Sequence, residues 1–143
     1  MPRLFFEAEG DEECPTAFGG PSDVLVYFLS LAFSTRYGAT HELSQLAMLL
    51  RGEHKIDLKP LTTFADRDVE VEADSRELDR AWQDAAPLAE TLRRAVDVLD
   101  APDERVATLT ADTPDLRDRL DDLRRMAEWA AGRGTRVRLS FEL

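Results

Sequence analysis

The sequence predicts an α+β fold, in which a small, largely antiparallel sheet of about three to five strands is packed by about four helices, including a central helical hairpin. Segments near both ends of the chain alternate apolar and polar residues at the period of a strand. Longer stretches between them repeat apolar residues at the period of a helix. With 143 residues, the chain is expected to form one domain over residues 1–143.

The first predicted element is a strand over residues 3–9, because Leu4, Phe6 and Ala8 fall on one face. Residues 10–22 are rich in glycine, proline and acidic residues, which is typical of a loop. This loop leads directly into the most apolar part of the chain.

Residues 24–33 are almost wholly apolar and are too short to cross a membrane, so they predict a buried core helix. Gly38 can end this helix, and Thr40 can cap a second helix over residues 41–51. The connection between them is short, so the two helices are expected to pack together as a hairpin. The apolar stripe of the second helix consists of Leu43, Leu46, Ala47 and Leu50.

The middle of the chain begins with two segments, residues 55–59 and 68–73, that alternate and predict two strands joined as a hairpin. Residues 75–100 then carry the longest helical pattern, with a kink or break expected at Pro87. Their spacing is that of a helix packed lengthwise on another helix. The apolar positions are Leu78, Trp82, Ala85, Ala89, Leu92, Val96 and Leu99.

Residues 105–110 are predicted to be a short strand or an extended connector. Thr113 and Pro114 are typical of a helix start, and the following helix repeats the same spacing with Leu116, Leu120, Leu123, Ala127 and Ala130. The two heptad-patterned helices could pair within the chain, or one seam could serve a homodimer. Residues 135–143 alternate strictly and predict a last strand, which could neighbour the first.

The charge balance constrains the class of partner. Acidic residues number 29 against 18 basic ones, which gives a formal net charge of -11. This charge disfavours nucleic acid and anionic membrane as partners and suits a basic protein surface. Cys14 is the only cysteine, which fits a reducing compartment, and no signal-peptide core is present, so we expect a cytoplasmic protein.

The helical hairpin also permits a helix-turn-helix interpretation, in which the second helix would read DNA. That helix offers only Arg51 to neutralise phosphates. We therefore favour a packed helical hairpin.

The acidic loop is the weak candidate for a metal site. Asp11, Glu12, Glu13 and Asp23 could together hold Mg²⁺ or Ca²⁺, although their spacing matches no EF-hand. These acids also oppose a reactive thiolate at Cys14, because nearby negative charge raises the pKa of a thiol. No cofactor is predicted.

The leading hypothesis is a non-catalytic binding or regulatory protein that acts through protein-protein contacts on an acidic, helix-rich surface. Trp82 and Trp129 are the interface candidates, although we favour core packing as the role of both side chains. The alternative is a small enzyme with a divalent-metal or scattered active site near the 10–23 loop. A second alternative is a helix-turn-helix DNA binder.

Overall fold

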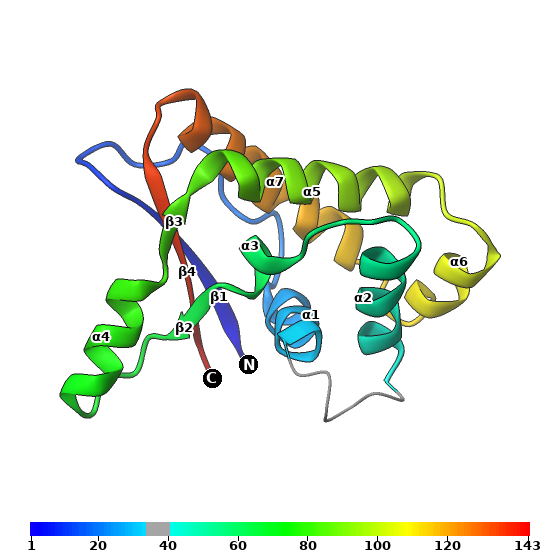
Figure 1. The fold of residues 1–143 in the computed structure, drawn as a ribbon, viewed down its shortest axis with the longest axis horizontal. Coiled ribbons are helices and arrows are strands. Elements are labelled where there is room, and N and C mark those ends of the chain that lie inside the picture. The colour runs from blue at the N-terminus through cyan, green and yellow to red at the C-terminus, as the bar shows by residue number, and fades with distance from the viewer. Residues whose placement is uncertain (34–40) are drawn as a thin grey trace.

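The computed structural model describes residues 1–33 and 41–143, and within them it shows an α+β fold of seven helices and a four-stranded mixed sheet (Figure 1). The fold class that the sequence predicts is therefore confirmed. In chain order, the elements are β1 (Arg3–Ala8), α1 (Asp23–Phe33), α2 (Glu42–Gly52), α3 (Lys59–Thr62), β2 (Phe64–Asp66), α4 (Glu72–Arg80), β3 (Trp82–Asp84), α5 (Ala85–Asp100), α6 (Glu104–Thr110), α7 (Leu116–Gly132) and β4 (Arg136–Glu142).

Strand β4 is the centre of the sheet and pairs with each of the other three strands. Strand β1 runs antiparallel along one edge of β4, with Leu4 opposite Phe141. This confirms the prediction that the first and last strands could be neighbours. The other edge of β4 is shared by two short strands: β2 runs parallel beside its end, and β3 runs antiparallel beside its start. Strand β1 is therefore an edge strand.

Helices α5 and α7 pack on each other, and α7 also contacts β1 and β4 (Figure 1). The predicted pairing of the two heptad-patterned helices therefore occurs within the chain. Burying a leucine side chain completely stabilises a fold by about 2 kcal/mol, so each buried leucine of these two helices contributes substantially to the core. The fully buried ones are Leu88, Leu92, Leu116, Leu120 and Leu123.

The hairpin helices α1 and α2 pack together, as the sequence predicts. His41 caps α2, because its Nδ1 atom accepts a hydrogen bond from the Leu43 N–H at 3.1 Å. The expected roles of Gly38 and Thr40 lie outside the described residues. Among the helices described, none is long and apolar enough to cross a membrane.

The predicted strand over residues 55–59 is wrong. Lys55 has a φ of 54°, which interrupts an extended backbone, and α3 begins at Lys59. Two backbone carbonyls of this segment accept hydrogen bonds from side chains of α5. The Thr91 hydroxyl donates to the Asp57 carbonyl at 2.8 Å, and the Arg94 guanidinium donates to the Lys55 carbonyl at 3.1 Å.

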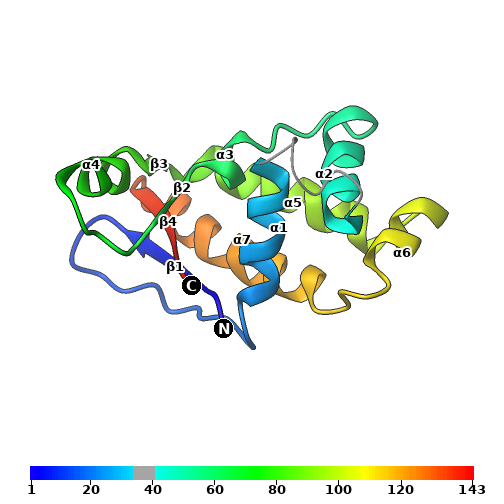
Figure 2. The ribbon, with the colours of Figure 1, turned by 90° about the horizontal axis from the view of Figure 1, so that it is seen from below.

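The predicted strand over residues 68–73 is also wrong, because the chain enters α4 at Glu72. The Asp74 carboxylate accepts hydrogen bonds from the N–H groups of Glu70 and Val71 at 3.0 and 3.2 Å, which starts the helix instead. No residue of α4 is buried. Both views place α4 at the end of the molecule opposite α2 and α6 (Figures 1 and 2).

The long helical pattern over residues 75–100 is divided by strand β3, so Trp82 lies on the sheet and not on a helix seam. The break precedes Pro87, which sits in the first turn of α5, where a missing N–H costs nothing. Residues 105–110 belong to helix α6 and not to a strand or extended connector. The Asp103 carboxylate caps this helix by accepting from the Val106 N–H at 2.9 Å.

Candidate functional site

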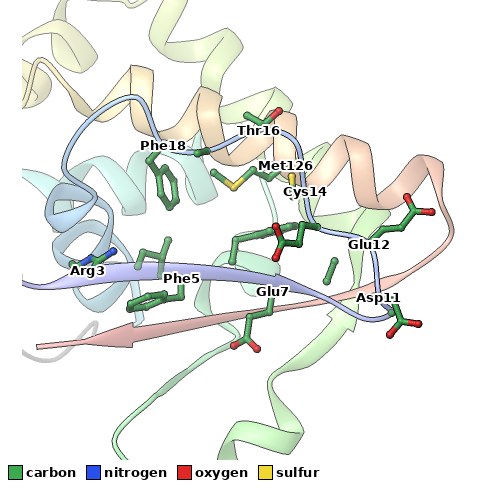
Figure 3. A pocket seen from close by; sticks show the side chains of 15 residues that line it. Arg3, Phe5, Glu7, Asp11, Glu12, Cys14, Thr16, Phe18 and Met126 are labelled. Atoms are coloured by element: carbon green, nitrogen blue, oxygen red, sulfur yellow. The ribbon is translucent and has the colours of Figure 1, made fainter.

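A groove runs along β1, on the side of the strand away from β4 (Figure 3). The chain leaves β1 and turns at Gly10, whose φ of 104° is a conformation that glycine adopts without strain. Residues 11–18 then return beside the strand. The open groove has a volume of about 580 Å³ and is lined by β1, by this returning segment and by Met126 of α7.

The floor of the groove is apolar. Phe6 and Ala8 of β1, with Cys14 and Phe18 of the returning segment, are half-buried and pack against the core, and the buried Met126 of α7 also lines the groove. The Cys14 thiol is therefore part of this apolar packing. A peptide or other ligand that entered the groove would meet both apolar side chains and strand backbone.

The rim of the groove is acidic, because Asp11, Glu12 and Glu13 are exposed around it (Figure 3). Glu12 forms an ion pair with Arg133 at 2.7 Å. Within the described part of the chain, no ion pair engages Asp11 or Glu13.

The far end of the loop is fixed to the body of the molecule. The Gly19 N–H donates to the Asp122 carboxylate at 2.9 Å, and the Leu4 N–H donates to the Ser22 hydroxyl at 2.9 Å. A Cβ atom on Gly20 would lie 2.0 Å from Nη1 of Arg119, so only glycine fits without moving that guanidinium. These glycines lie against the Arg119–Asp122 ion pair of α7 and do not form an anion cradle.

The four metal candidates do not meet. Asp11, Glu12 and Glu13 lie at the groove, whereas Asp23 lies in the first turn of α1 and lines a separate cavity of about 410 Å³. Across residues 1–33 and 41–143, no group of three or more His, Cys, Asp or Glu side chains is placed to hold a metal ion.

The outer face of the sheet carries an ionic layer centred on Glu7. Its carboxylate is bound by Arg67 at 3.1 Å and by Arg138 at 3.0 Å. The Arg67 guanidinium also stacks over the Phe5 ring, 4.1 Å from its centroid, and donates to Ser140 at 3.2 Å. These carboxylate and guanidinium groups join neighbouring parts of the sheet, and their charges are already paired with one another.

Both tryptophan candidates are half-buried and covered by arginines. The Arg138 guanidinium lies 4.6 Å from the centroid of the Trp82 ring, and that of Arg133 lies 5.3 Å from the centroid of the Trp129 ring. Trp129 also packs against the core. A role of either side chain at an interface stays a prediction.

The structure does not provide the basic side chains on α2 that a helix-turn-helix protein needs to contact DNA phosphates. The Arg51 guanidinium, the only basic group on α2, donates to the Ala32 carbonyl at 2.6 Å and so joins the two helices. The turn between them lies outside the described residues.

Comparison with known proteins adds no further constraint: no family model, no curated protein and no solved structure matches this chain. The sequence indicated the strand and the acidic loop but not the groove. The groove exists because β1 lies at an edge of the sheet, and strand order leaves no local signal in residues 3–9.

Proposed function

We propose that this chain is a non-catalytic binding protein that holds a basic segment of a partner protein in the groove beside β1. The observation that carries the proposal is the combination of an apolar floor with the carboxylates of Asp11 and Glu13, which no ion pair in the described chain engages. The cavity of about 580 Å³ lies within the range of about 300–1,000 Å³ common for ligand sites.

Charge supports a basic partner. With a net charge of -11, the whole molecule attracts a cationic segment, and the rim then fixes where that segment docks. A second copy of the chain is a poorer occupant, because two acidic rims would face each other. The proposed setting is the cytoplasm, where the thiol of Cys14 stays reduced.

The test is a pull-down from cell lysate with three baits immobilised in equal amounts: the unmodified chain, a rim variant and a control variant. The rim variant is Asp11→Asn with Glu13→Gln. The control, Glu77→Gln with Asp79→Asn, removes the same charge from the exposed helix α4, which lies beside β2 and not beside the groove. Captured proteins are identified by mass spectrometry at low and at high salt.

The expected result is a basic protein retained by the unmodified chain and by the control, weakened by the rim variant and released by salt. Equal retention by the rim and control variants would show that the groove is not the binding site. Capture that salt leaves unchanged would contradict the electrostatic part of the proposal.

A further inference from the structure

Along β1, residues whose backbone groups bond to β4 alternate with residues whose backbone groups face the groove. The Glu9 N–H donates to the Arg136 carbonyl at 3.0 Å, and Glu9 continues the antiparallel register in which Ala8 lies opposite Val137. In an antiparallel pair, hydrogen-bonded and non-hydrogen-bonded positions alternate. The odd-numbered residues therefore bond to β4, and the even-numbered ones direct their N–H and C=O groups away from it.

Within residues 1–33 and 41–143, only one of these outward N–H groups has a hydrogen-bond partner. The Leu4 N–H donates to the Ser22 hydroxyl at 2.9 Å, which confirms this alternation. Among the described residues, no hydrogen bond engages the N–H groups of Phe6 or Ala8, and no backbone hydrogen bond joins residues 11–18 to β1. The returning segment therefore runs beside the strand and leaves its outer edge unpaired (Figure 3).

We propose that the partner segment enters the groove as an added β-strand that pairs with Phe6 and Ala8. This inference rests on the proposed function and specifies its binding mode. An unpaired strand edge is a template for another chain, and strand addition derives affinity from main-chain hydrogen bonds and specificity from alternate side chains. Here the main-chain groups are the outward ones of β1, and the surface for alternate side chains is the apolar floor.

The pattern of the occupant follows from the two sides of the groove. Successive residues of a strand point to opposite faces, so every second residue of the added segment faces Phe18 and Met126 and is apolar. Asp11 and Glu13 favour lysine or arginine among the residues that face the rim. The occupant is therefore a short extended segment of another protein that alternates apolar and basic residues.

A peptide probe tests the binding mode directly. The probe is an end-blocked peptide of about seven residues that alternates lysine and valine, long enough to cover the open edge. Two further versions carry N-methyl groups, one on the lysine amides and the other on the valine amides. In an added strand, only one of these two sets of amides faces β1, and N-methylation removes its hydrogen bonds.

The expected result is that one N-methylated version loses about tenfold or more in affinity while the other binds like the parent. Saturation with the parent peptide is also expected to slow hydrogen exchange of the Phe6 and Ala8 amides, measured by NMR. The Glu7 amide, which already faces β4, serves as the internal reference.

A matched pair of protein variants provides the second measurement. Ala8→Pro removes an outward N–H and leaves the hydrogen bonds to β4 in place, because proline is tolerated on the open side of an edge strand. Ala8→Val keeps the N–H and enlarges the side chain. We expect the proline variant to bind the peptide several-fold more weakly than the valine variant, with both folded by circular dichroism.

The outcomes separate the binding mode from the function. Rim-dependent binding of all three peptides with equal affinity would overturn strand addition and leave the proposed function standing. Absence of binding by the parent peptide would overturn the proposed pattern of the occupant. Concentration-dependent protection of the Phe6 and Ala8 amides in the free protein would identify a second copy as the occupant and overturn the proposal.

Discussion

The α5–α7 helix pair and residues 68–73 both carry regular apolar patterns, but only the helix pair buries its pattern. Leu92 of α5 and Leu120 of α7 are completely buried. Val69 and Val71, which alternate with acidic residues, are 47% and 59% exposed. An alternating pattern predicts a strand because one face of a sheet is buried, and here the valines have no such face to join.

The longer segment of residues 55–84 is held by the buried side chains of Ile56, Leu58 and Leu61 and by single hydrogen bonds from side chains to the backbone. The Gln83 amide donates to the Pro60 carbonyl at 2.9 Å, and the Thr91 hydroxyl donates to the Asp57 carbonyl at 2.8 Å. Such bonds join residues 23 and 34 positions apart and follow no period. A sequence pattern is therefore informative where burial enforces it, and the following changes test that difference.

The largest effect is expected for Leu92→Ala in the buried helix contact. Removing a fully buried leucine leaves a cavity between α5 and α7, so we expect the free energy of unfolding to fall by about 3 kcal/mol. Urea denaturation followed by circular dichroism measures this change. A loss below about 1 kcal/mol would show that the helix contact is not close-packed.

The next effect is expected for Asp121→Asn on α7. Its carboxylate, 5% exposed, pairs with Arg124 at 2.7 Å, Arg125 at 3.0 Å and Arg117 at 3.6 Å. Breaking a buried ion pair costs about 3–5 kcal/mol, but these arginines are partly exposed and can turn to water. We therefore expect a loss of about 1–2 kcal/mol in the free energy of unfolding.

The same carboxylate predicts a pH dependence. Burial raises the pKa of Asp121, but the hydrogen bond from Arg124 and the nearby arginine charges outweigh burial, so its pKa lies below the usual range. A carboxylate whose pKa is lowered by folding stabilises the fold at pH values above its unfolded pKa of about 3.9. This stabilisation is lost as the pH falls through the pKa of the folded state. Urea titrations between neutral pH and about pH 2 should show a steeper acid loss for the unmodified chain than for Asp121→Asn.

A smaller effect is expected for Thr91→Val, which preserves shape and removes the hydroxyl that binds the Asp57 carbonyl. Thr91 is buried, so an unpaired carbonyl should cost about 1 kcal/mol in the free energy of unfolding. Thr91→Ser, which keeps the hydroxyl, is the control. If both variants unfold alike, the hydrogen bond does not fix residues 55–59.

The smallest effect is expected for Val71→Ser, because this side chain is more than half exposed and belongs to a part of the chain without buried residues. The free energy of unfolding should change by less than about 0.5 kcal/mol. A loss comparable to that of Leu92→Ala would mean that Val71 is buried in solution, and the contrast between the two regions would fail.

The outcome of sequence-based prediction follows the same division. Residues 24–33 form α1 as predicted, and one face of this apolar helix is buried in the core, whereas Tyr27 and Phe33 are exposed. The strand over residues 55–59 was wrong because the buried Ile56 and Leu58 join the helical core and not a sheet. At the site, the acidic loop was predicted, but the open N–H groups of Phe6 and Ala8 depend on strand order.

The central position of β4 has a consequence for the order of folding. Every strand pairing includes β4, and its bond to Glu9 joins residues 127 positions apart. Contacts between distant residues form slowly because a long loop must close first. We therefore expect the α1–α2 hairpin to form early and the sheet to form last, when β4 arrives with β1 on one side and β2 and β3 on the other and sets the edge that bounds the groove.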